Sequence, residues 1–371
     1  MTIPLSRPAL PQVGDGSGLE HDWRIHPEEL QLAFRNHAIL LEGLRYDRTP
    51  TGMHYTLSHY DVPHVDPATW RLEVGGLVDR PLSLSLADLQ VFPARTLRVT
   101  LECAGDGRAL LQPRPISQPW YEGAVGTADW TGTPLRDVLR DAGLMPGAQE
   151  VLFTGFDRGI EADLEQDYQR SLPLSEALRD DVWLVWAMND APLEPQHGAP
   201  VRLIVPGWYG MAHVKWLRSI EVLAEPFTGY QNALAYRYSQ TRDEAGEPVT
   251  LMRVRSLMIP PGIPDFLTRT RLVRRGRVEV HGRAWSGWPP IVRVEVSGDG
   301  GTSWAEAELE PPSSPHVWQA WRWSWHAEQP GRSELCCRAT DAAGNRQPTE
   351  AHWTARGMGN NAVQRVVVIV T

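Results

Sequence analysis

The sequence predicts two domains in series, an α+β domain followed by an all-β sandwich of the immunoglobulin-like class. Residues 26–245 mix short helical and short strand patterns without regular alternation, which is typical of α+β domains. From about residue 250, short alternating strands follow one another with turn clusters between them, which is typical of such a sandwich. The length of 371 residues suits two or three domains. We therefore expect an N-terminal arm over residues 1–25, a first domain over 26–245 and a second over 246–371.

Local patterns place the elements of the first domain. Apolar residues at every second position predict strands, and Ser, Thr, Pro and Gly at the ends of short runs predict helix boundaries. In chain order these rules predict a helix from His26-Pro27, a strand at 70–74, a helix capped by Ser85, a strand at 97–102, a helix capped by Thr133 and stopped by Gly143, a strand at 151–156, a helix at 176–179 capped by Ser175, and strands at 183–188, 201–205 and 214–223. We expect residues 43–66 and 112–129 to be irregular.

The second domain shows alternating runs separated by turn residues. The predicted strands lie at 278–282, 292–296, 321–325, 335–340 and 363–370. Glycine, serine and aspartate cluster at 297–303, and 341–345 is a second turn cluster, so both segments connect strands. The Cys…Trp…Cys spacing of antibody domains is absent.

Charge and motif content argue against several classes of function. The net charge of −9 and the lack of a basic tract argue against nucleic acid as a partner. The sequence has no membrane span of 18 apolar residues and no apolar signal segment after Met1, so we expect a cytoplasmic protein. Three cysteines without a C-x-x-C pair argue against structural zinc, iron–sulfur clusters and attached haem. Without a G-x-G-x-x-G motif at a helix start, NAD is not expected.

The stretch around Cys103 carries the clearest chemical signal. Residues 97–102 alternate apolar and polar side chains, which predicts a strand buried on one face. Gly105 and Gly107 then allow a tight turn or a close approach to a ligand. Cys103 is therefore either a small buried hydrophobe or, with Arg108 nearby, a thiolate that binds a metal or acts as a nucleophile.

Basic residues gather in a second region. Arg202, His213 and Lys215 could converge on a phosphate, with His197 at the other end of the loop that precedes Arg202. We expect His213 and Lys215 to share one face of a strand, although the same residues could form a solvated basic edge. Asp157 lies where a strand leaves the sheet and is either a site residue or a turn cap.

Several segments, in this order and spacing, resemble the sulfite oxidase family of molybdenum enzymes. The resemblance covers the chain from about Phe34 to Thr371. The segments that carry it are Phe34-Arg35-Asn36-His37, Leu101-Glu102-Cys103-Ala104-Gly105, Met188-Asn189-Asp190-Ala191-Pro192-Leu193, His197-Gly198-Ala199-Pro200-Val201-Arg202, His213-Val214-Lys215-Trp216-Leu217 and Ser297-Gly298-Asp299-Gly300-Gly301-Thr302-Ser303-Trp304.

The resemblance implies a molybdenum–molybdopterin cofactor and a role for each matching residue. Cys103 would supply the single protein thiolate to the metal. The implied cofactor-binding residues are Asn36, His37, Asp157, His197, Arg202, His213, Val214 and Lys215. The implied lining of an oxyanion pocket consists of Arg35, Arg108, Trp120, Tyr236 (with Tyr238 as its competitor) and Arg356.

The resemblance also implies a molybdopterin-binding catalytic domain followed by a dimerisation domain. We expect a homodimer that oxidises sulfite to sulfate by oxygen-atom transfer, with electrons passing to a separate acceptor or to oxygen because no haem domain precedes the first domain. Asp106-Gly107 replaces the Asn-Arg that is common in the family, so a different substrate (sulfane sulfur, nitrate or a sulfoxide) is the alternative. A non-enzymatic binding protein and a Cys103 hydrolase are alternatives of other classes.

Overall fold

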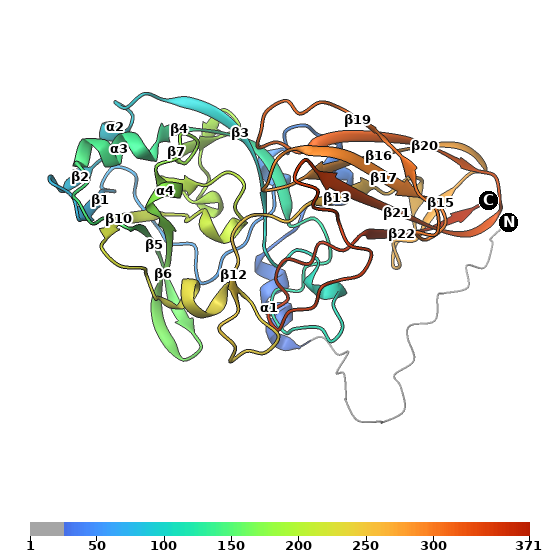
Figure 1. The fold of residues 1–371 in the computed structure, drawn as a ribbon, viewed down its shortest axis with the longest axis horizontal. Helices are drawn as coiled ribbons and strands as arrows, with labels where there is room; N and C mark the ends of the chain where they lie inside the picture. Colours follow the sequence, from blue (N-terminus) through green and yellow to red (C-terminus); the bar gives the residue numbers. More distant parts are fainter. Residues whose placement is uncertain (1–25) are drawn as a thin grey trace.

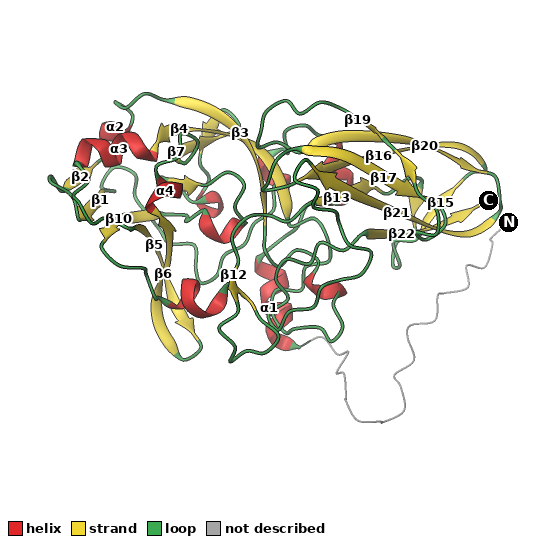
Figure 2. Cartoon of the chain, in the orientation of Figure 1, coloured by secondary structure: helices red, strands yellow, loops and turns green. Residues whose placement is uncertain are grey.

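The computed structural model describes residues 26–371, and the expected arm over residues 1–25 lies outside them. Figure 1 shows two regions side by side along the longest axis, a mixed region drawn from blue to yellow and a sandwich of strands drawn in orange and red. In Figure 2, strands and loops dominate both regions and the helices are short. Among residues 26–371, no helix has the length and apolar character that crossing a membrane requires.

A mixed sheet of the first region has the strand order β2-β1-β10-β5-β6. Its strands are β1 (Leu72–Gly76), β2 (Leu82–Leu84), β5 (Glu150–Glu161), β6 (Leu164–Pro173) and β10 (Leu217–Leu223). Strands β1 and β10 are parallel, whereas the other neighbours are antiparallel. The predicted strands at 70–74 and 151–156 are confirmed. Strand β6 was not predicted, because its sequence is largely polar and carries no apolar alternation.

A second sheet of the first region carries Cys103 at one strand end. Its strands are β3 (Arg95–Glu102), β4 (Val125–Pro134), β7 (Trp183–Met188) and β8 (Ala191–Pro192), in that order, with β9 (Arg202–Ile204) beside β7. Strand β4 begins inside the stretch predicted to be irregular. The prediction missed it because the strand is buried along most of its length and consists of small and polar residues without alternation. The predicted strands at 97–102, 183–188 and 201–205 are confirmed.

The prediction that β3 is buried on one face only is wrong at its C-terminal end. Thr100 and Glu102 are as buried as Leu101 between them. The second region covers this other face, since the backbone N–H of Trp318 donates to Thr100 Oγ1 over 2.9 Å.

The helices are short, and two of the predicted caps are wrong. The α-helices are α1 (Pro27–Arg35), α2 (Leu86–Leu89), α3 (Leu135–Ala142) and α4 (Leu174–Ala177); the 3₁₀ and π turns are η1 (Leu41–Arg45), η2 (Thr51–Met53), η3 (Arg108–Leu110), η4 (Pro195–His197), η5 (Gly210–Ala212) and η6 (Gln231–Ala235). Ser85 caps α2, and Gly143, at φ +74°, ends α3, as predicted. Thr133 instead lies in β4 and Ser175 inside α4, and a proline occupies the N-cap position of each helix.

The predicted strand at 214–223 starts only at Leu217, so His213 and Lys215 do not share a strand face. Trp216 has a φ of +46°, which interrupts extended backbone just before β10. The indole N–H of Trp216 donates to the carbonyl of Pro195 over 2.7 Å and holds this kink. Residues 213–215 are therefore a loop whose side chains point in directions that period-2 counting does not predict.

Two facing sheets form the second region. One has the order β13-β16-β20-β19 and the other β14-β15-β22-β21-β17-β18. Their bounds are β13 (Arg255–Ile259), β14 (Ile263–Pro264), β15 (Arg271–Val273), β16 (Gly276–Trp285), β17 (Ile291–Ser297), β18 (Ala305–Glu306), β19 (Glu308–Leu309), β20 (Gln319–Ala327), β21 (Gly331–Asp341) and β22 (Gln364–Val370). Buried residues such as Val280, Trp321 and Leu335 fill the space between them. The five strands predicted for this region are confirmed.

A small hairpin joins the two regions. It consists of β11 (Arg237–Tyr238) and β12 (Glu247–Pro248), which pair antiparallel. The predicted boundary between residues 245 and 246 falls in the loop of this hairpin, and its placement stays a prediction.

Candidate active site

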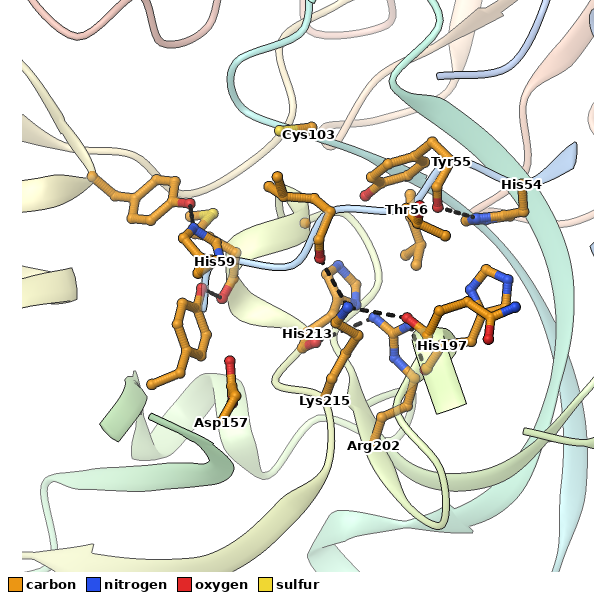
Figure 3. Close-up of a pocket in the computed structure, with 17 residues that line it drawn as sticks. His54, Tyr55, Thr56, His59, Cys103, Asp157, His197, Arg202, His213 and Lys215 are labelled. Atoms are coloured by element: carbon orange, nitrogen blue, oxygen red, sulfur yellow. Dashed lines mark hydrogen bonds between the residues drawn. The ribbon is translucent and has the colours of Figure 1, made fainter. Parts of the chain in front are cut away.

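A partly enclosed pocket in the first region receives side chains from many separate segments (Figure 3). Its lining consists of His54, Tyr55, Thr56, Leu57, His59, Leu101, Cys103, Asp157, Tyr168, Gln196, His197, Arg202, Gly210, Met211, His213, Lys215 and Tyr236. The pocket thus brings together seven of the residues singled out in the sequence, namely Cys103, Asp157, His197, Arg202, His213, Lys215 and Tyr236.

Cys103 lies at the pocket wall directly after β3, with 7% of its surface exposed. Its backbone N–H donates to the carbonyl of Ala124 over 2.8 Å, which ties the residue to the start of β4. Burial raises the pKa of the Cys103 thiol, while the nearby Arg108 charge and the indole N–H of Trp120 act in the opposite direction. A metal cation bound beside this thiol would favour its thiolate form.

Several buried polar atoms around the pocket have no partner within residues 26–371. They include Asp157 Oδ1, Arg202 Nε and His54 Nε2. Buried donors and acceptors are normally paired, so an unpaired group at a cavity wall indicates that a ligand completes it. This mixture of donors and acceptors beside a cysteine fits a polar, metal-bearing organic cofactor.

The lower wall of the pocket in Figure 3 holds two cations, Arg202 and Lys215. Arg202 donates to the carbonyls of His197 (3.0 Å) and His213 (3.2 Å), which aligns its guanidinium. Lys215 Nζ donates to the carbonyl of Leu57 over 2.8 Å. Burial lowers the pKa of Lys215 to about 7, so a bound anion would favour its charged form. The two cations suit a phosphate group.

The histidines of the pocket are neutral near pH 7. Burial lowers the pKa of His54 to about 4 and that of His197 to about 3. His213 accepts from the backbone N–H of Val205 (3.0 Å) through Nδ1, so its Nε2 donates to the carbonyl of Trp208 (3.1 Å). These imidazoles therefore act as hydrogen-bonding groups rather than as charges.

Asp157 faces Lys215 across the pocket floor. Burial raises the pKa of the Asp157 carboxyl to about 7, while the Lys215 charge opposes this shift. Val214, between His213 and Lys215, is buried and does not line the pocket. Its carbonyl accepts the backbone N–H of Leu203, which is a structural contact.

The structure does not bring Asn36 and His37 to the pocket. The Asn36 amide bonds Gln118 and the backbone N–H of Ser58, and the exposed His37 ring bonds Thr56 Oγ1. Residues of the loop 54–59, which follows η2, line the pocket instead. Sequence reasoning missed this loop, although its content of histidine and tyrosine within the predicted irregular stretch was a usable signal.

The predicted oxyanion residues fall into two groups. Tyr236 lines the pocket, whereas Tyr238 lies under the Arg253 guanidinium at 4.2 Å, so the structure favours Tyr236 over its competitor. Arg35 is exposed and donates to the carbonyl of His59 over 3.1 Å, near the pocket. Trp120 lies against Cys103.

Arg108 and Arg356 meet outside the pocket lining. Arg108 is buried and donates to the carbonyl of Gln118 (2.9 Å), to the carbonyl of Arg356 (3.0 Å) and to the sulfur of Met358 (3.4 Å). Neither arginine is part of the pocket lining. Arg108 therefore acts on Cys103 through its charge. Arg356 contacts Arg108 through its backbone carbonyl oxygen.

Asp106, which replaces the asparagine common in the family, does not line the pocket. Its side chain is fully buried and pairs with Arg255 of the second region, Nη1 to Oδ2, over 3.2 Å. Its other oxygen accepts the backbone N–H of Ala124 over 2.9 Å. The buried Arg255, which also pairs with Glu102, offsets part of the charge that the replacement of asparagine introduces.

Comparison with known proteins assigns the family. Residues 59–231 match the oxidoreductase molybdopterin binding domain, and residues 247–371 match the Mo-co oxidoreductase dimerisation domain. Sulfite oxidase of Gallus gallus is 34% identical over 340 residues, which cover 85% of this chain and 72% of the relative. The chain belongs to the sulfite oxidase family of molybdenum-dependent oxidoreductases. This membership argues against a non-enzymatic binding protein and against a Cys103 hydrolase.

Other relatives in the family differ in size and in named activity. Mitochondrial sulfite oxidase of Homo sapiens is 37% identical over 348 residues, which cover 87% of this chain and 62% of the relative. Nitrate reductase of Hordeum vulgare is 34% identical over 352 residues, which cover 87% of this chain and 39% of the relative. The chain thus spans about three fifths of the length of the mammalian relatives. The crystal structure of the sulfane dehydrogenase SoxCD from Paracoccus pantotrophus has the same fold, with a TM-score of 0.76, 23% identity and 100% of this chain covered.

Proposed function

We propose that this protein oxidises sulfite to sulfate with a molybdenum–molybdopterin cofactor to which Cys103 supplies the protein thiolate. The observation that carries the proposal is the position of Cys103 at the wall of a pocket in which three buried polar atoms, those of Asp157, Arg202 and His54, lack partners among the described residues. When bound, the cofactor supplies the two-electron redox chemistry. The residues of the chain hold it in place and attract the anion.

The two sides of the pocket suit different parts of the reaction. Arg202 and Lys215 would hold the phosphate of the cofactor, and Asp157 and His54 would complete their hydrogen bonds on its organic part, with His197 beside them in the lining. On the Cys103 side, burial raises the pKa of Tyr236 well above its usual value, so its hydroxyl keeps its proton and can donate to an oxyanion. Arg35 and the buried Arg108 add positive charge near His59 and Tyr236, which favours a dianion.

A different oxyanion or sulfur substrate remains the alternative. Gly107, at φ +81°, occupies a position where the family commonly has arginine, so one cation is missing. A Cβ at Gly107 would lie 3.0 Å from the Asn360 side chain, so the site has little room for a larger residue. Fewer cations favour a substrate of lower charge, such as nitrate or a sulfane sulfur.

The decisive experiment uses protein made in a host that synthesises the cofactor. About one molybdenum per chain and a visible spectrum that changes on addition of sulfite would support the proposal. Steady-state rates with sulfite, nitrate and a sulfoxide identify the substrate. Wild-type turnover by the Cys103→Ala protein would contradict the ligand role of Cys103.

We propose further that residues 247–371 mediate a C2 homodimer, since they match a dimerisation domain and this symmetry is the commonest among oligomers. Sedimentation velocity tests this, and a monomer at all concentrations would contradict it. We propose that the electrons pass to a separate acceptor protein or to oxygen, and rates with each in turn distinguish the two. The cytoplasmic location stays a prediction.

A further inference from the structure

The loop that carries Cys103 is held in part by the second region. The backbone N–H of Gly359 donates to the carbonyl of Ala104 over 2.7 Å. The side-chain amide of Asn360 donates to the carbonyl of Gly107 over 2.8 Å. Both donors belong to the segment that leads into β22, so backbone oxygens on either side of Gly105 are bonded to the distant end of the chain.

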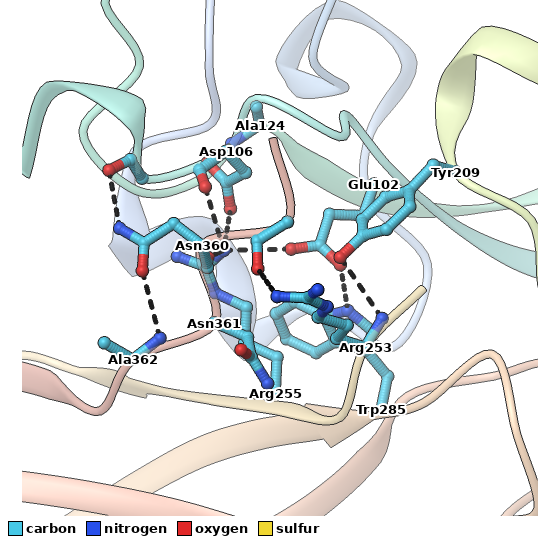
Figure 4. Close-up of polar contacts among 12 residues, drawn as sticks. Glu102, Asp106, Ala124, Tyr209, Arg253, Arg255, Trp285, Asn360, Asn361 and Ala362 are labelled. Carbon is cyan, nitrogen blue, oxygen red and sulfur yellow. Dashed lines mark hydrogen bonds and ion pairs between the residues drawn. The ribbon is translucent and has the colours of Figure 1, made fainter. Parts of the chain in front are cut away.

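Arg255, the first residue of β13, forms the centre of these contacts (Figure 4). Its Nη1 donates to Glu102 Oε1 over 3.0 Å and to the carbonyl of Asp106 over 3.3 Å, and it pairs with Asp106 Oδ2 over 3.2 Å. The same nitrogen donates to the carbonyl of Asn360 over 2.9 Å. One guanidinium therefore joins both flanks of Cys103 to the segment that contains Asn360.

The second oxygen of Glu102 is also held from the second region. The indole N–H of Trp285, the last residue of β16, donates to Glu102 Oε2 over 2.9 Å. Successive side chains of a strand point to opposite faces. A Glu102 side chain anchored in the second region therefore directs the next side chain, that of Cys103, the other way, toward the pocket.

The burial of these charged side chains indicates a role beyond holding the two regions together. The Arg255 side chain is 2% exposed, that of Glu102 1% and that of Asp106 0%. Removing ions from water costs enough that a buried pair often adds no net stability over apolar packing. Such a cluster is better suited to selecting one conformation of the loop than to strengthening the fold.

We propose that Arg255 is a positioning residue that sets the direction of the Cys103 thiolate through Glu102 and Asp106, so that the second region shapes the metal site. This assignment rests on the proposed role of Cys103 as metal ligand. It gives residues 247–371 a task in addition to dimerisation, because the support of the ligand loop comes from the same polypeptide region.

The test compares two buried arginines of the second region in the cofactor-loaded protein. Arg255→Met removes the guanidinium that bonds Glu102 and Asp106 on the two sides of Cys103. Arg283→Met is the matched control, because Arg283 donates to the carbonyl of Leu44 over 2.8 Å and to Asp47 over 2.7 Å, and so also joins the two regions but not through the Cys103 loop. Molybdenum content, the thiolate-to-metal absorption band in the visible, kcat and KM for sulfite are measured for each.

At equal molybdenum content, we expect Arg255→Met to shift the visible band and to lower kcat about 10- to 100-fold with little change in KM, as loss of an outer support of a metal ligand does. Arg283→Met should keep the band of the parent even if its melting temperature falls. Arg255→Lys should give a smaller shift, since lysine keeps the charge but not the planar fork. An unshifted band in Arg255→Met, or an equal shift in Arg283→Met, would overturn the proposal.

Two further variants keep the outcome clear. If Arg255→Met does not fold, Trp285→Phe removes the donor to Glu102 and keeps the ring, and an unshifted band in both Trp285→Phe and Arg255→Lys would then reject the positioning role. A Cys103→Ser protein that keeps the band would remove the basis of the proposal. Failure of the parent to oxidise sulfite would contradict only the proposed substrate, because the band still reports the position of Cys103.

Discussion

The hydroxyl of Tyr236 lies 2.7 Å from Nε2 of His59, and the two rings close one side of the pocket next to Cys103. The two residues are 177 positions apart in the sequence. Burial lowers the pKa of His59 to about 3, so the imidazole is neutral at neutral pH. The pair therefore presents a hydroxyl oriented by a neutral ring at the place where an oxyanion would bind.

Tyr236→Phe tests the role of this hydroxyl. Loss of one donor to an oxyanion should lower kcat/KM for sulfite about 100-fold. Tyr238→Phe is the control and should leave kcat/KM unchanged, because Tyr238 packs under Arg253 outside the pocket. Steady-state kinetics of the two variants decide between the tyrosines, and a larger effect at Tyr238 would refute the assignment.

Lys215→Met tests the phosphate end of the pocket. The variant loses the donor to the carbonyl of Leu57 and the cation beside Asp157, so molybdenum content should fall about tenfold or more. Arg218→Met, two strand positions into β10 and paired with Asp167 on the outer part of the sheet, is the control. Metal analysis of purified protein measures both, and full occupancy in Lys215→Met would show that the lysine does not hold the cofactor.

Gly105→Ala tests whether Arg108 must lie against the Cys103 loop. A Cβ on Gly105 would collide with the Arg108 guanidinium, which is itself held by three protein acceptors. We expect a raised KM for sulfite and a higher pKa of the thiol, since the cation moves away from Cys103. Gly75→Ala, where a Cβ meets nothing within 4 Å, is the control. An unchanged KM in Gly105→Ala would show that the position of Arg108 does not affect anion binding.

His213→Gln tests the pH dependence of stability. Burial lowers the pKa of His213 from 6.5 to about 3, so between these values the unfolded chain binds a proton that the folded protein does not. Stability must then fall as pH drops through this window, by about 1.4 kcal/mol per pH unit for this residue. Glutamine can replace both hydrogen bonds of the ring without titrating.

Urea unfolding at pH 5 and pH 7 measures this effect. The parent should lose more free energy of unfolding on acidification than His213→Gln does. His281→Gln, at an exposed position of β16, should behave like the parent. Equal pH dependence of the parent and His213→Gln would show that the ring is protonated in the folded protein.

Much of the fold was readable from local patterns. Strands such as β3 and β17 alternate apolar and polar residues, and Ser85 and Gly143 mark helix ends through their own backbone chemistry. Strands β4 and β6 were not predicted, because a strand that is covered on both faces or built of polar residues shows no period-2 alternation in its sequence. The N-caps predicted at Thr133 and Ser175 are wrong. A proline lies one position before each helix and occupies its N-cap.

The sequence by itself determined the family chemistry: one cysteine in a strand-to-glycine-loop context, and separate basic segments whose order along the chain is specific. It could not determine which side chains reach the pocket. His54 and His59 enter it while Asn36 and His37 do not, and Asp106 pairs with Arg255 outside the lining. Only the tertiary structure decides these directions. Asn36, His59 and Asp106 each bond a partner more than 80 residues away, and local backbone preferences carry no information about such a partner.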